Sequence, residues 1–122
     1  MSYLFRTKSY IKWRGEYEKV YEAFITTHSP NPTSRPVKIA VLDTGIDGDH
    51  DAFEARKENI KAKKNFYNTA QKNIADFNGH GTFTASLILD YAQDAELYIA
   101  KIADRENATP NAKIVVEVSS FR

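Results

Sequence analysis

The spacing of hydrophobic residues changes along the chain and divides it into segments. Over residues 13–25 apolar side chains recur every three or four positions, which predicts an amphipathic helix that packs its aromatic stripe against its own core. Residues 27–36 hold three of the four prolines and are expected to form an extended linker. A first unit, made of a helical arm and this linker, is therefore predicted over residues 1–36.

Short apolar runs after the linker predict a parallel sheet. Residues 37–42 (VKIAVL) are typical of a strand buried on both faces. Residues 60–67 alternate apolar residues with lysines and predict a peripheral strand, while residues 97–103 (LYIAKIA) predict a third. A nearly all-apolar helix is expected over residues 79–92, with Asn78 as its N-cap. This order of strand, helix and strand favours an α/β fold over residues 37–122.

The last segment carries conflicting signals. Thr109-Pro110 is typical of a helix start, whereas the β-branched run over residues 114–118 favours a strand. Both interpretations stay open at this point.

Charge and composition narrow the classes of function. The 122 residues include 17 basic and 16 acidic ones, so the net charge of +1 gives no reason to expect nucleic-acid binding. The chain has no cysteine, which excludes disulfides and thiolate sites and favours an intracellular location.

The first residues show no secretory or membrane signal. The apolar cluster at residues 3–5 is too short for a signal peptide, and no segment approaches the length of a membrane span. Residues 1–14 contain basic but no acidic side chains, which predicts a solvated basic arm, with a mitochondrial presequence as the alternative. No membrane partner is expected.

Two short motifs contain candidate catalytic residues. Asp43 follows the run at residues 37–42, at the end of a predicted strand, where open α/β sheets place their sites. His80 stands between two glycines at the predicted start of a helix, where the helix dipole disfavours the imidazolium form. A buried carboxylate that holds a neutral imidazole in one tautomer can activate a serine hydroxyl. Asp43 and His80 are therefore candidates for an acid and a base of this kind.

Other interpretations of these residues exist. Asp-Thr-Gly at Asp43 is also the motif of aspartic proteases, in which two carboxylates share a proton, but that fold is almost entirely β. Each motif taken singly also fits a simple turn or helix start. A group of polar side chains suggests either a metal site or, more simply, a polar turn; its members are Asp47, Asp49, His50 and Asp51.

Taken together, the two motifs closely resemble those of the subtilisin-like serine proteases, the subtilases. The aspartate motif matches residues 37–53, and the histidine motif, Asn-Gly-His-Gly-Thr at the start of a buried helix, matches residues 76–103. The resemblance implies an incomplete subtilisin-like fold, Asp43 and His80 as two members of the triad, and protein or peptide substrates. Many subtilases bind calcium with an aspartate at the position of Ala52, so no metal or other cofactor is expected here.

The third member of the triad is not among these residues. Subtilases carry the nucleophile in a downstream Gly-Thr-Ser motif, which this sequence lacks, together with the oxyanion-hole asparagine. None of the serines after His80 follows a glycine, and Ser86 is turned away from it on the same helix; the others are Ser119 and Ser120. The chain is therefore expected to be the N-terminal part of a catalytic domain and inactive alone. A non-catalytic interaction module or pseudoenzyme is the alternative.

Overall fold

The computed structural model describes residues 3–27, 35–105 and 112–119. The chain divides into two compact units, residues 1–35 and residues 36–122, and each is described by itself. The elements in chain order are α1 (Tyr3–Thr27), β1 (Lys38–Asp43), α2 (Asp51–Glu54), η1 (Lys57–Asn59), β2 (Ile60–Asn65), α3 (His80–Tyr91), β3 (Glu96–Lys101) and α4 (Ala112–Ser119).

The first unit contains the long helix α1. It begins at Tyr3 instead of Trp13, so the basic segment at the start of the chain is part of the helix. Aromatic rings spaced by three or four residues follow one another along α1, and the rings of Trp13 and Tyr17 stack with centroids 5.8 Å apart. Most of the predicted linker lies outside the described residues. None of the helices within the described ranges has the length and apolar character needed to cross a membrane.

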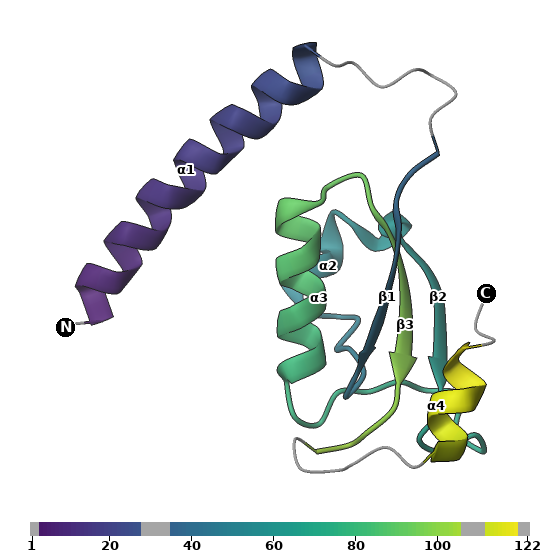
Figure 1. Ribbon diagram of the computed structural model, residues 1–122. Helices are drawn as coiled ribbons and strands as arrows, with labels where there is room; N and C mark the ends of the chain where they lie inside the picture. The colour runs from purple at the N-terminus through teal and green to yellow at the C-terminus, as the bar shows by residue number, and fades with distance from the viewer. Residues whose placement is uncertain (1–2, 28–34, 106–111, 120–122) are drawn as a thin grey trace. The chain divides into compact units, whose positions relative to one another are not determined.

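The second unit is built on a parallel sheet of three strands in the order β1-β3-β2 (Figure 1). Along β1 and β3 the pairing runs from Lys38 beside Glu96 to Asp43 beside Lys101. Along β2 and β3 it ends at Asn65, also beside Lys101. Parallel strands end at the same edge of a sheet, so Lys101 lies between Asp43 and Asn65 at this edge. The predicted α/β fold with a parallel sheet and flanking helices is confirmed.

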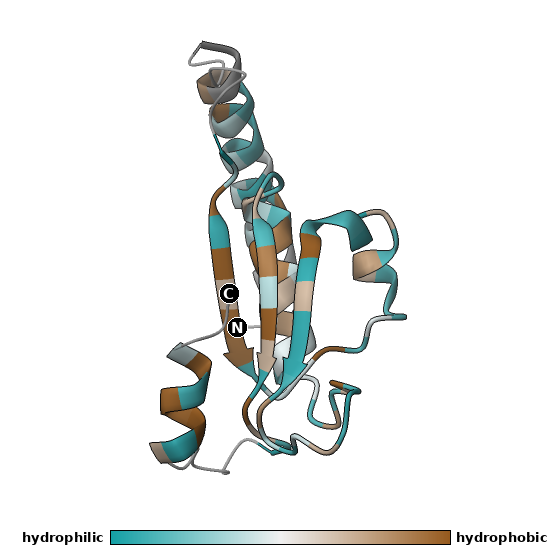
Figure 2. Cartoon of the chain, turned by 90° about the vertical axis from the view of Figure 1, so that its right-hand side faces the viewer, coloured by the Kyte–Doolittle hydropathy of each residue, from teal (hydrophilic) through white to brown (hydrophobic). Residues whose placement is uncertain are grey.

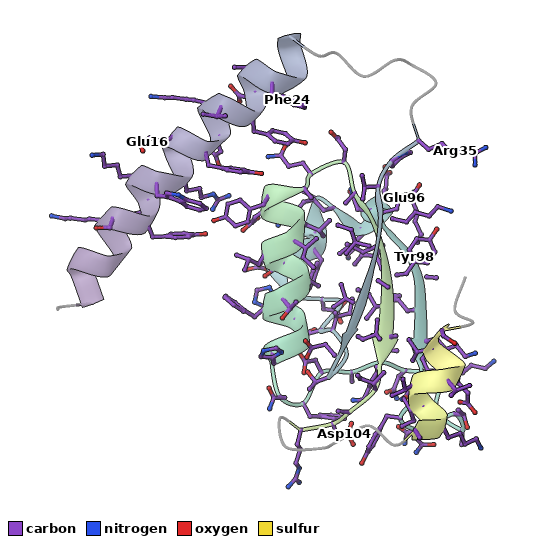
Figure 3. The ribbon with its side chains drawn as sticks, in the orientation of Figure 1. Glu16, Phe24, Arg35, Glu96, Tyr98 and Asp104 are labelled. Atoms are coloured by element: carbon purple, nitrogen blue, oxygen red, sulfur yellow. The ribbon has the colours of Figure 1, made fainter. Side chains whose placement is uncertain are left out.

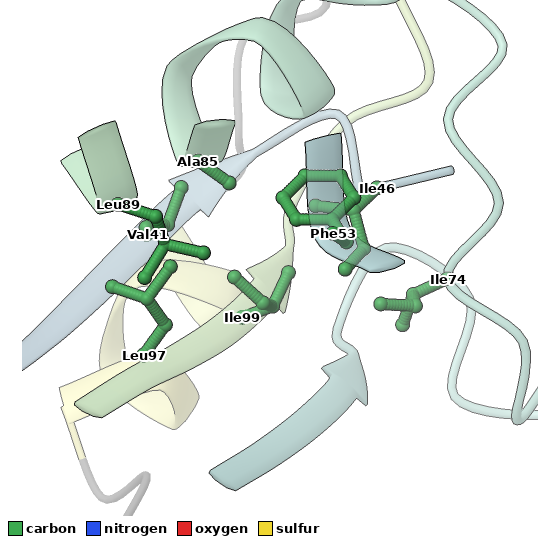
Figure 4. Close-up of a cluster of buried hydrophobic side chains, with 8 residues drawn as sticks. All are labelled: Val41, Ile46, Phe53, Ile74, Ala85, Leu89, Leu97 and Ile99. Carbon is green, nitrogen blue, oxygen red and sulfur yellow. The ribbon is translucent and has the colours of Figure 1, made fainter. Parts of the chain in front are cut away.

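The hydrophobic core lies between the sheet and the helices α2 and α3, which cover one face (Figures 1 and 4). Leu97 and Ile99 of β3 alternate with Tyr98, which faces the opposite side of the sheet (Figure 3). The cluster comprises Val41, Ile46, Phe53, Ile74, Ala85, Leu89, Leu97 and Ile99. Burial of these side chains holds α3 against the strands and thereby fixes where its first residue lies.

The prediction that residues 37–42 form a strand buried on both faces is wrong. β3 is the central strand of the described sheet, and β1 lies at its edge, where Leu42 is 45% exposed. Figure 2 shows β1 largely hydrophobic and β2 largely hydrophilic. Hydrophobicity therefore overestimated the burial of β1, because an edge strand leaves part of one face open to solvent.

The helix α4 lies on the other side of the sheet, near the carboxyl ends of the strands (Figure 1). Its buried Ile114 packs with Phe66 and Ala100, and Val118 lies one turn further along against the same cluster. The strand interpretation of residues 114–118 is thus wrong: β-branched residues four positions apart give this segment an apolar helix face.

The crossover between β1 and β2 contains short helices that the periodicity did not predict. The imidazole Nδ1 of His50 caps α2 by accepting a hydrogen bond from the amide of Ala52 at 3.2 Å. The fully buried ring of Phe53 then anchors α2 to the core. The amide of Asp49 donates to a carboxylate oxygen of Asp47 at 3.2 Å, so the polar residues of this segment form a turn.

Candidate active site

Asp43 is the last residue of β1 and lies at the carboxyl edge of the sheet. Its Oδ1 accepts a hydrogen bond from the amide of Thr44 at 2.8 Å. Gly45 then turns the chain with a φ of 106°, and a Cβ at this position would lie 2.1 Å from the carbonyl oxygen of Ile74. Only glycine fits both the left-handed backbone and this close approach.

His80 is the first residue of α3. The N-cap of this helix is Gly79, with a φ of 95°, and not Asn78 as the sequence pattern predicted. A left-handed backbone at the cap position favours glycine, and the Asn78 side chain instead accepts a hydrogen bond from the amide of His80 at 3.2 Å. The next residue, Gly81, lies so close to Gly45 that an added Cβ would meet its carbonyl oxygen at 2.1 Å.

The structure brings the two predicted site residues together. The Nδ1 atom of His80 lies 2.9 Å from Oδ1 and 2.9 Å from Oδ2 of Asp43. An ionised carboxylate only accepts hydrogen bonds, so it selects the neutral tautomer with the proton on Nδ1 and the lone pair on Nε2. The Asp43 side chain is 14% exposed and that of His80 57% exposed. The pair therefore combines a shielded acid with an accessible ring.

Asp76 forms a dense set of hydrogen bonds beside this pair. Its Oδ1 accepts from the Thr44 hydroxyl at 2.7 Å and from the amides of Asn78 and Gly79 at 3.0 and 2.8 Å. Its Oδ2 accepts from the amide and the hydroxyl of Thr82 at 2.8 and 2.6 Å. Burial raises the pKa of this carboxyl, but the hydrogen bonds from Thr82, Gly79 and Thr44 outweigh burial and hold its pKa well below the usual range.

Two threonine hydroxyls extend these contacts across the site. Thr44, from the β1 side, accepts a hydrogen bond from the amide of Gly81 at 3.1 Å. Thr82, from the α3 side, accepts one from the amide of Asp47 at 2.9 Å. Each hydroxyl thus donates to Asp76 and accepts from the opposite segment. Sequence reasoning assigned no role to Asp76, Thr44 or Thr82.

A buried lysine holds the loop that carries Asp76. The side chain of Lys101 is 2% exposed, and its Nζ donates a hydrogen bond to the carbonyl oxygen of Ala75 at 2.5 Å. The same ammonium forms an ion pair with Asp104 at 2.6 Å and lies 4.9 Å from the centre of the Phe77 ring. Figure 3 places Asp104 just after the end of β3. These contacts compensate the buried charge.

The other sequence candidates lie away from the pair or are engaged elsewhere. The hydroxyl of Ser86 donates to the carbonyl oxygen of Phe83 at 2.8 Å, and that of Ser119 donates to Val116 at 2.6 Å, both within their own helices. Ser120 lies outside the described residues. Across the described part of the chain, no group of three or more His, Asp or Glu side chains is placed to hold a metal ion.

A carboxylate–imidazole pair at the carboxyl edge of a parallel α/β sheet is an arrangement suited to general acid–base catalysis. Residues 34–119 match the sequence model of the Subtilase family, so the chain belongs to that family. The aspartic-protease interpretation of Asp43 is therefore set aside.

Known proteases are similar to the same part of the chain. An intracellular serine protease of Paenibacillus polymyxa is 35% identical over 86 residues, which is 61% of this chain and 26% of that protein. Subtilisin-like protease 6 of Arthroderma benhamiae is 32% identical over 95 residues, 74% of this chain and 22% of that protein. The human membrane-bound transcription factor site-1 protease is 36% identical over 76 residues, 57% of this chain and 7% of that protein. The chain thus spans about a quarter or less of these relatives.

Proposed function

We propose that this chain supplies the acid and the base of a serine endopeptidase site that cleaves protein substrates. The observation that carries the proposal is the contact of His80 Nδ1 with both carboxylate oxygens of Asp43 at 2.9 Å. Membership of the subtilase family supports it. The serine nucleophile would come from a segment outside these 122 residues.

In the proposed reaction His80 acts first as a base and then as an acid. Its Nε2 takes the proton from the serine hydroxyl as the oxygen attacks the peptide carbonyl, and Asp43 stabilises the imidazolium that forms. His80 then returns the proton to the leaving amine. A water molecule, deprotonated by His80, then attacks the acyl-enzyme. His80 returns the proton to the serine oxygen, and the second product is released.

The 122 residues alone are expected to have no proteolytic activity. The hydroxyls of Ser86 and Ser119 are bonded to their own helices, and the sequence contains no Gly-Thr-Ser segment. An acid and a base without a nucleophile or oxyanion donors lack the groups that make and stabilise the new bond. Treatment of the purified chain with a fluorophosphonate probe should leave it unlabelled, and labelling would overturn this expectation.

A chimaera tests the proposed roles directly. Residues 37–104 of this chain would replace the aligned segment of the Paenibacillus polymyxa intracellular serine protease, whose remainder supplies the serine. The chimaera is expected to hydrolyse a denatured protein, and His80→Ala should lower kcat by a factor on the order of 10⁴ or more. Asp43→Ala should also lower kcat strongly, whereas Asp90→Ala, near the other end of α3, should leave it unchanged.

Two outcomes of the chimaera experiment would contradict the proposal. One is hydrolysis that survives both His80→Ala and Asp43→Ala. The other is a chimaera that is folded, as cooperative unfolding followed by circular dichroism would show, but has no activity. The second outcome would favour the non-catalytic interaction module.

Calcium is not expected to bind at the position used by many relatives of this family. The side chain of Ala52 offers no oxygen ligand, and the preceding His50 caps α2. Calorimetric titration of the chain with calcium chloride should therefore give no stoichiometric heat of binding.

A further inference from the structure

We propose that Asp76 is a positioning residue that holds Asp43 and His80 in register. This inference rests on the proposed function, because it concerns the geometry of the same acid and base. Asp76 contacts neither the carboxylate of Asp43 nor the imidazole of His80 in the hydrogen bonds it forms. It acts through Thr44 and Thr82, each of which lies one or two residues from a member of the pair.

The two oxygens of Asp76 serve the two sides of the site. Oδ1 accepts the hydroxyl proton of Thr44, the residue directly after Asp43. Oδ2 accepts the amide and the hydroxyl of Thr82, two residues after His80. One carboxylate thus connects the segments of Thr44 and Thr82, and its bond to Thr44 joins positions that differ by 32 in residue number.

Asp76 also sets the direction of two further hydrogen bonds. A threonine hydroxyl has a single proton, and in Thr44 and Thr82 that proton points to Asp76. The lone pairs are thereby turned toward the amides of Gly81 and Asp47, which belong to the opposite segments. Removal of the carboxylate would leave both hydroxyls free to rotate, so the two cross-links should weaken together.

The tight backbone contact makes the site sensitive to small movements. Gly81 and Gly45 approach so closely that there is no room for a Cβ between them. A shift of α3 against β1 would therefore also change the distance from His80 to Asp43. Misplacement of catalytic groups by about 1 Å costs on the order of 10² in rate.

Asp76 itself has an independent support. Lys101 binds the carbonyl oxygen of the preceding Ala75 from the end of the central strand. The hydrogen bonds that Asp76 accepts keep its pKa well below the usual range, although burial acts in the opposite direction. The carboxylate is therefore charged, and able to accept all these bonds, throughout the neutral pH range.

The nitrogen-15 NMR shifts of the histidine rings in the full 122-residue chain test the proposal. They report which ring nitrogen carries the proton. In the unmodified chain His80 should show the Nδ1–H tautomer, with the signal assigned by its loss in His80→Gln. Asp76→Ala should abolish most of this Nδ1–H signal. Asp76→Asn keeps one acceptor oxygen, and Thr44→Val removes the two hydrogen bonds of the Thr44 hydroxyl but leaves those of Thr82, so each should cause a smaller loss.

The same spectrum contains an internal control. Nδ1 of His50 accepts a hydrogen bond from Ala52, so its neutral ring must carry the proton on Nε2. If the substitution of Asp76 acts locally, it changes the His80 signal and leaves the His50 signal unchanged. Asp90→Ala, which removes a carboxylate from α3 far from its first turn, should change neither signal.

Asp43→Asn separates this inference from the proposed function. If this variant loses the Nδ1–H signal of His80 but folded Asp76→Ala keeps it, the pair exists and the positioning role is overturned. If Asp76→Ala unfolds, an unchanged His80 signal in both Asp76→Asn and Thr44→Val overturns the role equally. If the unmodified chain shows no Nδ1–H signal, or Asp43→Asn retains it, the pairing itself is wrong.

Discussion

The two ends of the parallel sheet use polar side chains in different ways. At the carboxyl end, Asn65 and Lys101 are buried and donate hydrogen bonds to backbone carbonyls of the loop that leads to Asp76. At the amino end, Arg56 and Asp90 form an ion pair at 2.8 Å with about a quarter of each side chain exposed. Both sets of contacts connect segments that are distant in the sequence, but Asn65 and Lys101 are buried, whereas Arg56 and Asp90 are partly exposed.

The difference in burial decides which of these contacts hold the loops in one arrangement. A buried polar group must keep its partner, because losing it costs the desolvation of that group in full. Water can replace the partner of an exposed group at little cost. The carboxyl end therefore holds its loops in one arrangement, as an acid and a base at fixed distance require, whereas the amino end mainly joins the crossovers.

The largest effect is expected from adding a methyl group between the carboxyl-end loops. Gly45→Ala would place a Cβ 2.1 Å from the carbonyl oxygen of Ile74, on a backbone that side chains rarely adopt. We expect a loss of about 3 kcal/mol or more in the free energy of unfolding, measured by urea denaturation followed by circular dichroism. Gly81→Ala should behave alike, since its Cβ would meet the backbone of Gly45 at 2.1 Å.

Gly48→Ala is the matched control for these variants. Its Cβ would meet nothing within 4 Å, so the free energy of unfolding should change by less than about 1 kcal/mol. Equal urea midpoints for Gly45→Ala and Gly48→Ala would show that the loops are not packed as described.

Two asparagines provide a comparison between the ends of the sheet. Asn65, 4% exposed at the carboxyl end, donates to the carbonyl of Asn73 at 2.9 Å and accepts from the amide of Asn68 at 2.7 Å. Asn59, only half-buried at the amino end, donates to two backbone carbonyls at 2.8 and 2.9 Å. Asn65→Ala should destabilise the chain by about 2 kcal/mol and Asn59→Ala by about 1 kcal/mol in urea denaturation. A larger loss for Asn59→Ala would reverse the proposed difference.

Acid should weaken the contribution of Asp76 in a predictable direction. Its pKa is lowered in the folded chain, whereas an unfolded aspartate has a pKa of about 3.9. The stability that its ionised form provides is therefore fully present above about pH 5 and is lost as the pH falls below about 4 toward the lowered pKa. Asp76→Asn lacks this contribution. The difference in urea midpoint between the unmodified chain and Asp76→Asn should thus shrink from pH 6 to pH 3; a constant difference would refute the linkage.

The sequence predicted the parts of this structure that depend on local pattern. The strands, the buried helix α3 and the pair formed by Asp43 and His80 follow from periodicity, from glycines and from motif resemblance. Burial of β1 was overestimated because hydropathy cannot tell an edge strand from a central one. The N-cap of α3 was misplaced because the prediction looked for a capping side chain. Gly79 instead takes the cap position through a left-handed backbone and makes no side-chain hydrogen bond there.

The roles of Asp76, Thr44 and Thr82 depend on tertiary contacts and so could not be read from periodicity. The only signal was a carboxylate four positions before His80 and a threonine two positions after it, which alone suggests helix capping. The link from Asp76 to Thr44 spans 32 residues and exists only once β1 and α3 are packed. The same holds for Lys101, whose burial contradicts what its side chain alone would suggest.

The smallest effect is expected at the amino end, from Asp90→Ala. Arg56 keeps two hydrogen bonds to the carbonyl oxygen of Ala52 when Asp90 is removed, and water can solvate the rest of the guanidinium. The free energy of unfolding should fall by about 0.2–1 kcal/mol, and by less at high salt, because salt screens a partly exposed ion pair. Urea denaturation at low and high sodium chloride measures both values. If Asp90→Ala were as damaging as Asn65→Ala, the amino end would hold its segments as firmly as the carboxyl end, and burial would not be what distinguishes the site.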